Sequence, residues 1–254
     1  MKVGLISDIH ANAVALEAVL ADLGRERPDR LVCLGDLVGG GPQPREVIAR
    51  VRGLGCPVVA GNVDVLVATF APEAVAPLIA YFVRRGATEA AARRMVDIND
   101  WSAAHLAPEE RTYLLQLQPT VTVELGEAAE LLCFHGSPRS YDDDVVATTP
   151  EAELDALLAG AEATVLAGGH THLPLLRRYG LSTVVNPGTV GVARAADARA
   201  GRKLPWAEYA LVSWEDGRLG VDFRRVPFDA GALGAAARAS GMPHADWFMQ
   251  AYAP

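Results

Sequence analysis

The N-terminal stretch LISDIH, residues 5–10, constrains the fold more than any other part of the chain. Residues 2–6 are short and apolar, as a buried β-strand should be, and a carboxylate and an imidazole follow them directly. Open α/β sheets bind ligands just beyond the carboxyl ends of their strands. Side chains two residues apart in an extended chain point to the same face, so Asp8 and His10 can converge on one metal ion. This ligand pair suits zinc, manganese, iron, cobalt or nickel better than magnesium or calcium.

The chain has 254 residues, of which 50% are hydrophobic, which suits one large domain or one domain with an insertion. We expect no membrane partner, because no apolar run is long enough to cross a bilayer and no signal peptide is recognisable. Three widely spaced cysteines, Cys33, Cys56 and Cys133, favour buried free thiols in a reducing, cytoplasmic location. The net charge of −8 argues against an extended nucleic-acid-binding surface.

Strand and helix patterns alternate over the first 60 residues. Strands are predicted at 2–6, 31–34 and 57–60, and helices at 13–23 and 44–54. This βαβαβ order predicts a parallel sheet. Residues 66–118 are rich in alanine, with helical patterns at 72–85, 88–96, 100–105 and 108–117. We interpret 66–118 as a helical insertion in a single domain, residues 1–254, and it either shapes access to the site or only packs beside it.

Strands return after residue 120. Hairpins are predicted for 120–125 with 130–134, for 173–179 with 182–185, and for 207–214 with 218–226. A helix at 151–158 precedes a further strand at 164–167, and helices are predicted at 230–238 and 246–252. The pattern indicates an α/β protein.

Polar residues directly follow five of these strands. They are Asp8, His10, Asp36, Asn62, His135, His170 and His172, and they include four of the six histidines. One histidine beside a strand is usually structural, but seven potential ligands at successive strand ends are difficult to obtain from packing alone. Glycines at 35, 61, 136 and 169 are expected to let the backbone turn where the side chains converge.

The seven residues divide into two ligand sets that share Asp36. The first set is Asp8, His10, Asp36 and His172, and the second is Asp36, Asn62, His135 and His170. Two divalent ions against two carboxylates would favour an anionic substrate such as a phosphoryl group. Paired metals can activate a water molecule and polarise phosphorus oxygens for in-line attack, and we assign the catalytic roles to Asp36, Asn62 and His135. Ser7 and Ser137 lack a base-and-orienter arrangement, so a serine hydrolase is not expected.

The ordered motifs D-x-H (8–10), G-D (35–36), G-N-x-D (61–64), H-G (135–136) and G-H-x-H (169–172) resemble those of the calcineurin-like metallophosphoesterase superfamily. N-P-G-T at 186–189 resembles a loop of its small bacterial phosphodiesterase branch. The resemblance implies a four-layer αββα sandwich of two mixed sheets. It also implies two divalent transition metal ions (Mn, Fe, Ni, Co or Zn), held by the two ligand sets of a metal-dependent phosphoesterase.

Position 63 departs from the family pattern. Many relatives have a histidine there that protonates the leaving oxygen, and this chain has Val63. General-acid assistance, typically about 10²–10⁴-fold, is therefore absent or comes from elsewhere. Phosphodiesters, anhydrides or aryl esters are favoured over alkyl phosphomonoesters because their leaving groups are better. His105 could substitute, although a lone histidine on a mixed helix is more often structural, and Asp64 is expected to support the site or cap a helix.

Two further residues are candidate substrate ligands. Asn12 either donates to a phosphate oxygen or caps the first helix, and Arg139 either clamps a phosphate or is a solvated loop charge. The acidic run at 142–144 is expected to form a surface loop near the pocket, which weighs against long nucleic acids.

The expected partner is therefore a small phosphate-ester or nucleotide substrate. The sequence leaves open whether the chain forms a homo-oligomer. Two alternatives share the same residues. One is a binding scaffold that keeps the fold and has lost the chemistry. The other is a protein Ser/Thr phosphatase, which usually relies on the missing histidine.

Overall fold

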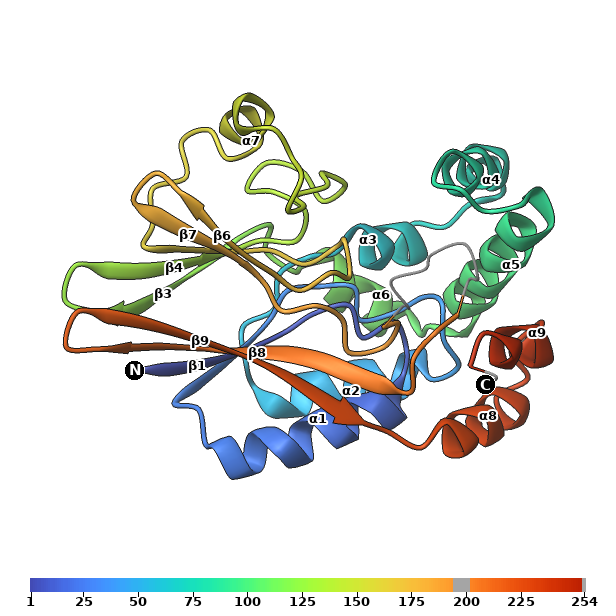
Figure 1. Ribbon diagram of the computed structural model, residues 1–254. Coiled ribbons are helices and arrows are strands. Elements are labelled where there is room, and N and C mark those ends of the chain that lie inside the picture. Colours follow the sequence, from blue (N-terminus) through green and yellow to red (C-terminus); the bar gives the residue numbers. More distant parts are fainter. Residues whose placement is uncertain (194–201, 253–254) are drawn as a thin grey trace.

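Two mixed β-sheets lie face to face in the computed structural model, which describes residues 1–193 and 202–252 (Figure 1). The first sheet has the order β2-β1-β8-β9, formed by β1 (Lys2–Ile6), β2 (Arg30–Cys33), β8 (Trp206–Glu215) and β9 (Arg218–Pro227). The second has the order β3-β4-β5-β7-β6, formed by β3 (Val121–Gly126), β4 (Ala129–Cys133), β5 (Val165–Ala167), β6 (Leu175–Tyr179) and β7 (Ser182–Asn186). Strand β1 pairs in parallel with β2 and antiparallel with β8. Cys33 of β2 also forms a parallel bridge with Val58, so the parallel order predicted for the N-terminal βαβαβ segment is confirmed.

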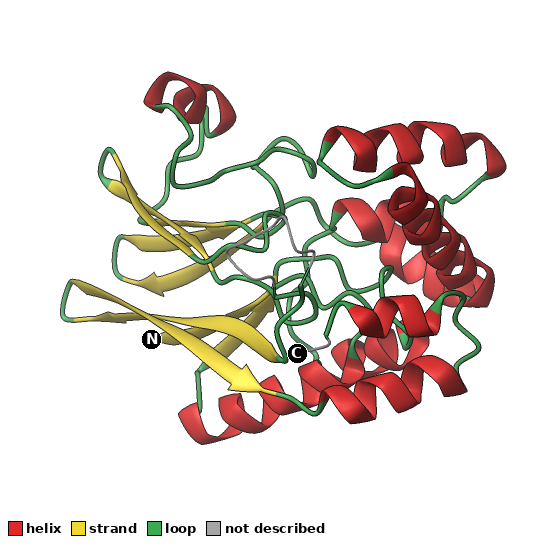
Figure 2. Cartoon of the chain, turned by 45° about the vertical axis from the view of Figure 1, so that its right-hand side comes forward, coloured by secondary structure: helices red, strands yellow, loops and turns green. Residues whose placement is uncertain are grey.

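Helices cover the outer faces of both sheets. Helices α1 (Ala13–Glu26) and α2 (Pro44–Leu54) lie on the first sheet, and α7 (Glu151–Leu157) lies over the second. The remaining helices gather at one end of the two sheets (Figure 2). They are α3 (Asn62–Ala68), the short 3₁₀ helix η1 (Pro72–Ala74), α4 (Val75–Arg84), α5 (Glu89–His105), α6 (Pro108–Leu115), α8 (Ala230–Ala239) and α9 (Ala245–Gln250).

Three groups of buried apolar side chains fill the three interfaces between these layers. Side chains of β1 belong to two of these groups, because successive side chains of a strand point to opposite faces of the sheet. Leu5 packs between the sheets with Leu131, and Ile6 packs with Leu16 on the helical side. The third group joins α7 to the second sheet through Leu154. The layers are therefore helix, sheet, sheet and helix, and the predicted αββα sandwich is confirmed.

Two element predictions were wrong. Residues 57–60 form only isolated bridges, from Val58 to Cys33 and from Val59 to Gln118, because the segment turns away at Gly61 after two paired residues. The helices predicted at 88–96 and 100–105 are one continuous helix, α5. Asn99 lies between the two predicted helices. It is buried, and its Oδ1 accepts a hydrogen bond from the backbone N–H of Gly40.

The helical segment 66–118, which the sequence predicts to be an insertion, packs on the same core as α1 and α2. Ile98 of α5 and Leu114 of α6 are buried in one cluster with Ile48 of α2 and Val67 of α3. Among residues 1–193 and 202–252, no helix is both long enough and apolar enough to cross a membrane.

Replacement of Leu114 by alanine tests this packing. Leu114 is fully buried, so Leu114→Ala should lower the free energy of unfolding by about 2–5 kcal/mol. The neighbouring Leu115 is 52% exposed, and Leu115→Ala is the matched control with little expected effect. Urea unfolding followed by circular dichroism measures both. Equal stability of the two variants would contradict a shared core.

Candidate metal centre

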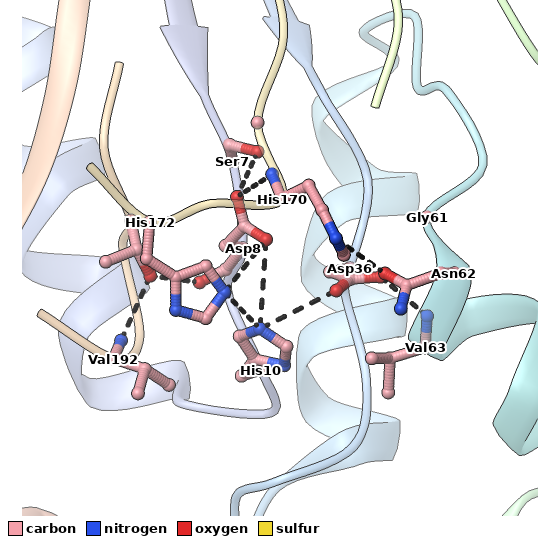
Figure 3. Close-up of polar contacts among 12 residues, drawn as sticks. Ser7, Asp8, His10, Asp36, Gly61, Asn62, Val63, His170, His172 and Val192 are labelled. Atoms are coloured by element: carbon pink, nitrogen blue, oxygen red, sulfur yellow. Dashed lines mark hydrogen bonds and ion pairs between the residues drawn. The ribbon is translucent and has the colours of Figure 1, made fainter. Parts of the chain in front are cut away.

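The seven predicted ligands meet where the two sheets face each other. Asp8 and His10 follow β1, and Asp36 follows β2, all in the first sheet (Figure 3). His135 follows β4, and His170 and His172 follow β5, in the second sheet; Asn62 begins α3. The site is therefore assembled from both sheets, at the carboxyl ends of their strands, as the sequence predicts.

The first ligand set converges closely. His10 Nε2 lies 3.0 Å from His172 Nε2 and 3.6 Å from Asp36 Oδ2. His172 Nε2 in turn lies 3.2 Å from Asp8 Oδ1. All four side chains thus direct one nitrogen or oxygen toward the same small region.

The second ligand set converges in the same way. His135 Nε2 lies 3.4 Å from Asp36 Oδ2 and 3.1 Å from Asn62 Oδ1. The same Asn62 oxygen lies 3.2 Å from His170 Nδ1. Asp36 Oδ2 therefore borders both sets.

A buried polar atom without a partner supports the fit of a cation to the first set. Asp8 Oδ1 is buried and has no hydrogen-bond partner among the described residues. Burial of an unpaired carboxylate oxygen is costly, and His172 Nε2 and His10 Nε2 lie 3.2 and 3.8 Å from Asp8 Oδ1. A divalent ion would satisfy the oxygen and the nitrogens together. The mixture of imidazole and carboxylate suits transition metals.

The ligands themselves make the tight backbone turns. Five of the seven have a positive φ: Asp8 (55°), His10 (47°), Asp36 (54°), His170 (63°) and His172 (60°). Non-glycine residues rarely adopt this conformation, and such strain clusters at functional sites. The expectation that glycines make these turns was wrong for three of the four, since only Gly35 has a positive φ. Gly61 and Gly169 instead allow close approach, because a Cβ on either would collide with Asp36 or Ser7.

Each carboxylate has one oxygen fixed by the protein and the other turned toward the site. Asp8 Oδ2 accepts hydrogen bonds from Ser7 Oγ (2.6 Å) and from the backbone N–H of His170 (3.1 Å). Asp36 Oδ1 accepts one from the backbone N–H of Val63 (2.8 Å). The second oxygens, Asp8 Oδ1 and Asp36 Oδ2, are thereby left for ions. Sequence analysis had missed Ser7 as a supporting residue, because a serine at a strand end carries no distinctive signal.

Asp64 holds the loop that carries Asp36. Its Oδ1 accepts from the backbone N–H groups of Leu37 (2.8 Å) and Val38 (3.2 Å), and its Oδ2 accepts from Gly61 (3.2 Å) in a capping arrangement at α3. Burial, with the nearby charge of Asp36, raises the pKa of the Asp64 carboxyl to about 7, although the N–H donors favour its charged form. The predicted supporting and capping role is confirmed.

The N-P-G-T loop ties the two ligand segments together. Asn186 Nδ2 donates to the carbonyl oxygen of Gly169 (2.5 Å) and to Thr171 Oγ1 (3.1 Å), beside both histidines of the G-H-x-H motif. Thr189 Oγ1 donates to the carbonyl oxygen of Asp8 (2.8 Å). The loop therefore supports the site without supplying a ligand from these two residues.

Three further residues, Asn12, Arg139 and His105, were weaker candidates, and their contacts differ from those of the seven predicted ligands. Asn12 Oδ1 accepts from the N–H of Ala15 and its Nδ2 donates to the Gly191 carbonyl, so its capping role is confirmed and its phosphate contact stays a prediction. Arg139 is exposed, and its role as a phosphate clamp also stays a prediction. His105 Nδ1 lies 2.7 Å from the Trp101 carbonyl one turn earlier in α5, a contact that fits the structural alternative.

Two imidazoles of the site, those of His10 and His135, differ in charge. Burial lowers the pKa of His10 to about 4, so this ring is neutral. Burial also disfavours a charged His135, but the carboxylates of Asp36 and Asp8 outweigh it and raise the pKa of His135 to about 10. The Nδ1 of His135 lies 2.7 Å from the Leu34 carbonyl, to which it donates. The dissociable proton is therefore on Nε2, the atom that faces the second ligand set.

The fold, with ligands from both sheets at its strand ends, defines a class of metal-binding α/β sandwich. The calcineurin-like phosphoesterase superfamily domain matches residues 1–209 of this chain. The chain therefore belongs to that superfamily, as its motifs predict.

Individual relatives agree with this assignment. The crystal structure of a metallophosphoesterase from Sphaerobacter thermophilus is 28% identical, with a TM-score of 0.71 over 99% of this chain and 98% of that one. A hypothetical protein from Pyrococcus horikoshii has the same fold, with 24% identity and a TM-score of 0.77 over 99% and 97% of the two chains. An uncharacterised protein of Methanocaldococcus jannaschii is 45% identical over 62 residues, which span 24% of this chain and only 26% of that relative.

Metal uptake should release the proton held by His135. At about pH 7.5 the metal-free ring is protonated and an ion must displace that proton, so about one proton per chain should be released on saturation with Mn²⁺. Affinity should rise with pH until the ring is neutral near its pKa of about 10. Titration calorimetry in buffers of different ionisation enthalpy measures the release. His135→Gln should lower it, and a binding heat that is independent of the buffer would contradict the assignment.

Proposed function

We propose that this protein is a dinuclear metal-dependent phosphoesterase that hydrolyses phosphodiester or nucleotide-type phosphate substrates. The observation that carries the proposal is the position of Asp36 Oδ2, 3.6 Å from His10 Nε2 and 3.4 Å from His135 Nε2. One carboxylate oxygen that borders two ligand sets is the arrangement needed by two ions about 3.5–4 Å apart. The likeness to a protein described as a metallophosphoesterase, at 28% identity over almost the whole chain, supports it.

Each residue has a role in this proposal. Asp8, His10, Asp36 and His172 would hold one ion, and Asp36, Asn62, His135 and His170 the other. Bound ions would supply the Lewis acidity that activates water and polarises the phosphoryl group. Hydrogen bonds fix the orientation of Asp8 and Asp36 before substrate arrives, and such preorganisation avoids rearrangement during the reaction.

The surroundings of the site favour a small substrate with a good leaving group. Val63 lies beside Asn62 at the start of α3 and has no proton to donate, so an alkoxide leaving group would depart without help from this position. Asp144 Oδ1 lies 3.5 Å from His170 Nε2, so the acidic run at 142–144 borders the site, as the sequence predicts. A carboxylate at this edge would repel the extended backbone of a long nucleic acid and tolerate a single phosphate ester.

A substrate panel tests the function. Aryl phosphodiesters, phosphomonoesters, dinucleoside polyphosphates and a phosphopeptide are assayed with Mn, Ni, Co, Fe or Zn. We expect metal-dependent hydrolysis that is fastest for aryl diesters or anhydrides, and loss of at least about 10²-fold in Asp36→Asn, because the shared ligand is weakened. Higher activity on the phosphopeptide would indicate a protein phosphatase. Two bound ions without turnover of any substrate would indicate the binding scaffold.

Restoring a proton donor at position 63 tests the substrate preference. Val63→His should raise kcat for an alkyl phosphomonoester by at least about tenfold, since general acids typically contribute about 10²–10⁴-fold and the new ring will not be ideally placed. Aryl diesters, which need no such help, should change little. Val63→Gln is the control, because it adds a polar side chain that cannot transfer a proton. An equal effect of both variants on both substrates would contradict the role given to this position.

A further inference from the structure

The helical insertion reaches the second ligand set through one ion pair. Arg85, the C-cap residue that follows α4, donates to both carboxylate oxygens of Asp144, from Nη1 to Oδ2 (2.9 Å) and from Nη2 to Oδ1 (2.7 Å). Asp144 Oδ1 lies 3.5 Å from His170 Nε2. Arg85, Asp144 and His170 therefore form a continuous polar chain from the insertion to the candidate metal centre.

The Nε2 atom of His170 needs a hydrogen-bond acceptor. Its Nδ1 faces Asn62 Oδ1 in the second ligand set, at 3.2 Å, so Nδ1 is the nitrogen available to an ion. A neutral imidazole that ligates through Nδ1 carries its proton on Nε2. Nε2 is buried and makes no hydrogen bond within the described residues, and the Asp144 carboxylate is the acceptor beside it. A carboxylate on the outer nitrogen commonly fixes the tautomer and plane of a metal-bound histidine.

The two histidines of the second ligand set are supported in different ways. His135 is held by the Leu34 carbonyl, next to β2 and deep in the fold. His170 faces a carboxylate on a loop, and that carboxylate is held by the insertion. The side chains of Arg85 and Asp144 are 40% and 45% exposed, and exposed ion pairs contribute little to stability. Arg85 is also oriented by its own helix, with Cζ 5.4 Å from the ring centroid of Tyr81.

We propose that Asp144, held by Arg85, is a positioning residue that keeps His170 in the orientation and tautomer required by the second ligand set. The insertion thereby sets the affinity of that set for its ion and leaves the first set unaffected. The inference rests on the proposed function in one respect only, namely that ions occupy both sets.

Mn²⁺ binding to the full chain tests the proposal. Titration calorimetry and electron paramagnetic resonance resolve a first and a second ion. Asp144→Ala should weaken the second ion by about 10–100-fold, the usual effect of removing such a support, and leave the first unchanged. Asp144→Asn keeps an acceptor oxygen and should recover part of the loss, and Arg85→Gln should weaken the second ion less than Asp144→Ala does. Asp142→Asn, on the same loop, is the matched control with no expected effect.

A double variant separates this role from a general structural one. His170→Ala removes the ring that Asp144 is proposed to position, so Asp144→Ala should cause no further loss in that background. Unchanged affinity of the second ion in Asp144→Ala would overturn the inference, as would equal weakening of both ions with a lowered Tm. The proposed function fails separately, if the wild-type protein binds fewer than two ions. Two ions bound by the wild-type protein, with the second bound equally tightly by Asp144→Ala, would overturn the inference alone.

Discussion

Side chains from two separate sheets have to meet within a few ångströms, and much of the molecule is arranged around this requirement. Five ligands adopt left-handed backbone, which costs roughly 1–3 kcal/mol each. Hydrogen bonds offset this strain: Asp64 binds three backbone N–H groups of the loops beside Asp36, and Asn186 and Thr189 bind the segments that carry the other ligands. Support of this kind explains how the site keeps its shape with two charged carboxylates buried inside it.

The α/β class and the seven converging residues could be predicted because both depend on short-range patterns, whereas the αββα sandwich was expected only from the resemblance to a known superfamily. Apolar strands that end at Asp36 or His135 identify candidate ligands without any knowledge of distant contacts, but not that the two strands belong to different sheets. Other features depend on which segments meet in space. The Arg85–Asp144 pair joins residues 59 positions apart. The buried Asn99 lies within α5, and its Oδ1 accepts a hydrogen bond from the backbone N–H of Gly40, about 60 residues earlier in the chain. The role of Gly61 depends on the approach of Asp36, which no local pattern reveals.

The two ligand sets are supported by different parts of the fold. The first is built on β1 and on a loop tied to it through Thr189 and Asn186, so it belongs to the interior of the sandwich. The second combines a core histidine with His170, whose outer nitrogen faces a loop carboxylate.

The place of β1 in the first sheet has a consequence for biosynthesis. This strand is central, between β2 and β8, and its partner residues in β8 follow it by about 200 positions, as the pair Lys2 and Ser213 shows. At about 5–20 residues per second, a ribosome takes roughly 10–40 seconds to make the intervening chain. Throughout that interval one edge of β1 has no partner, and unpaired apolar edges are prone to associate with other chains. The nascent protein is therefore a natural client for chaperones that shield exposed strands, and the sheet that carries Asp8 and His10 cannot be completed until β8 and β9 have been synthesised.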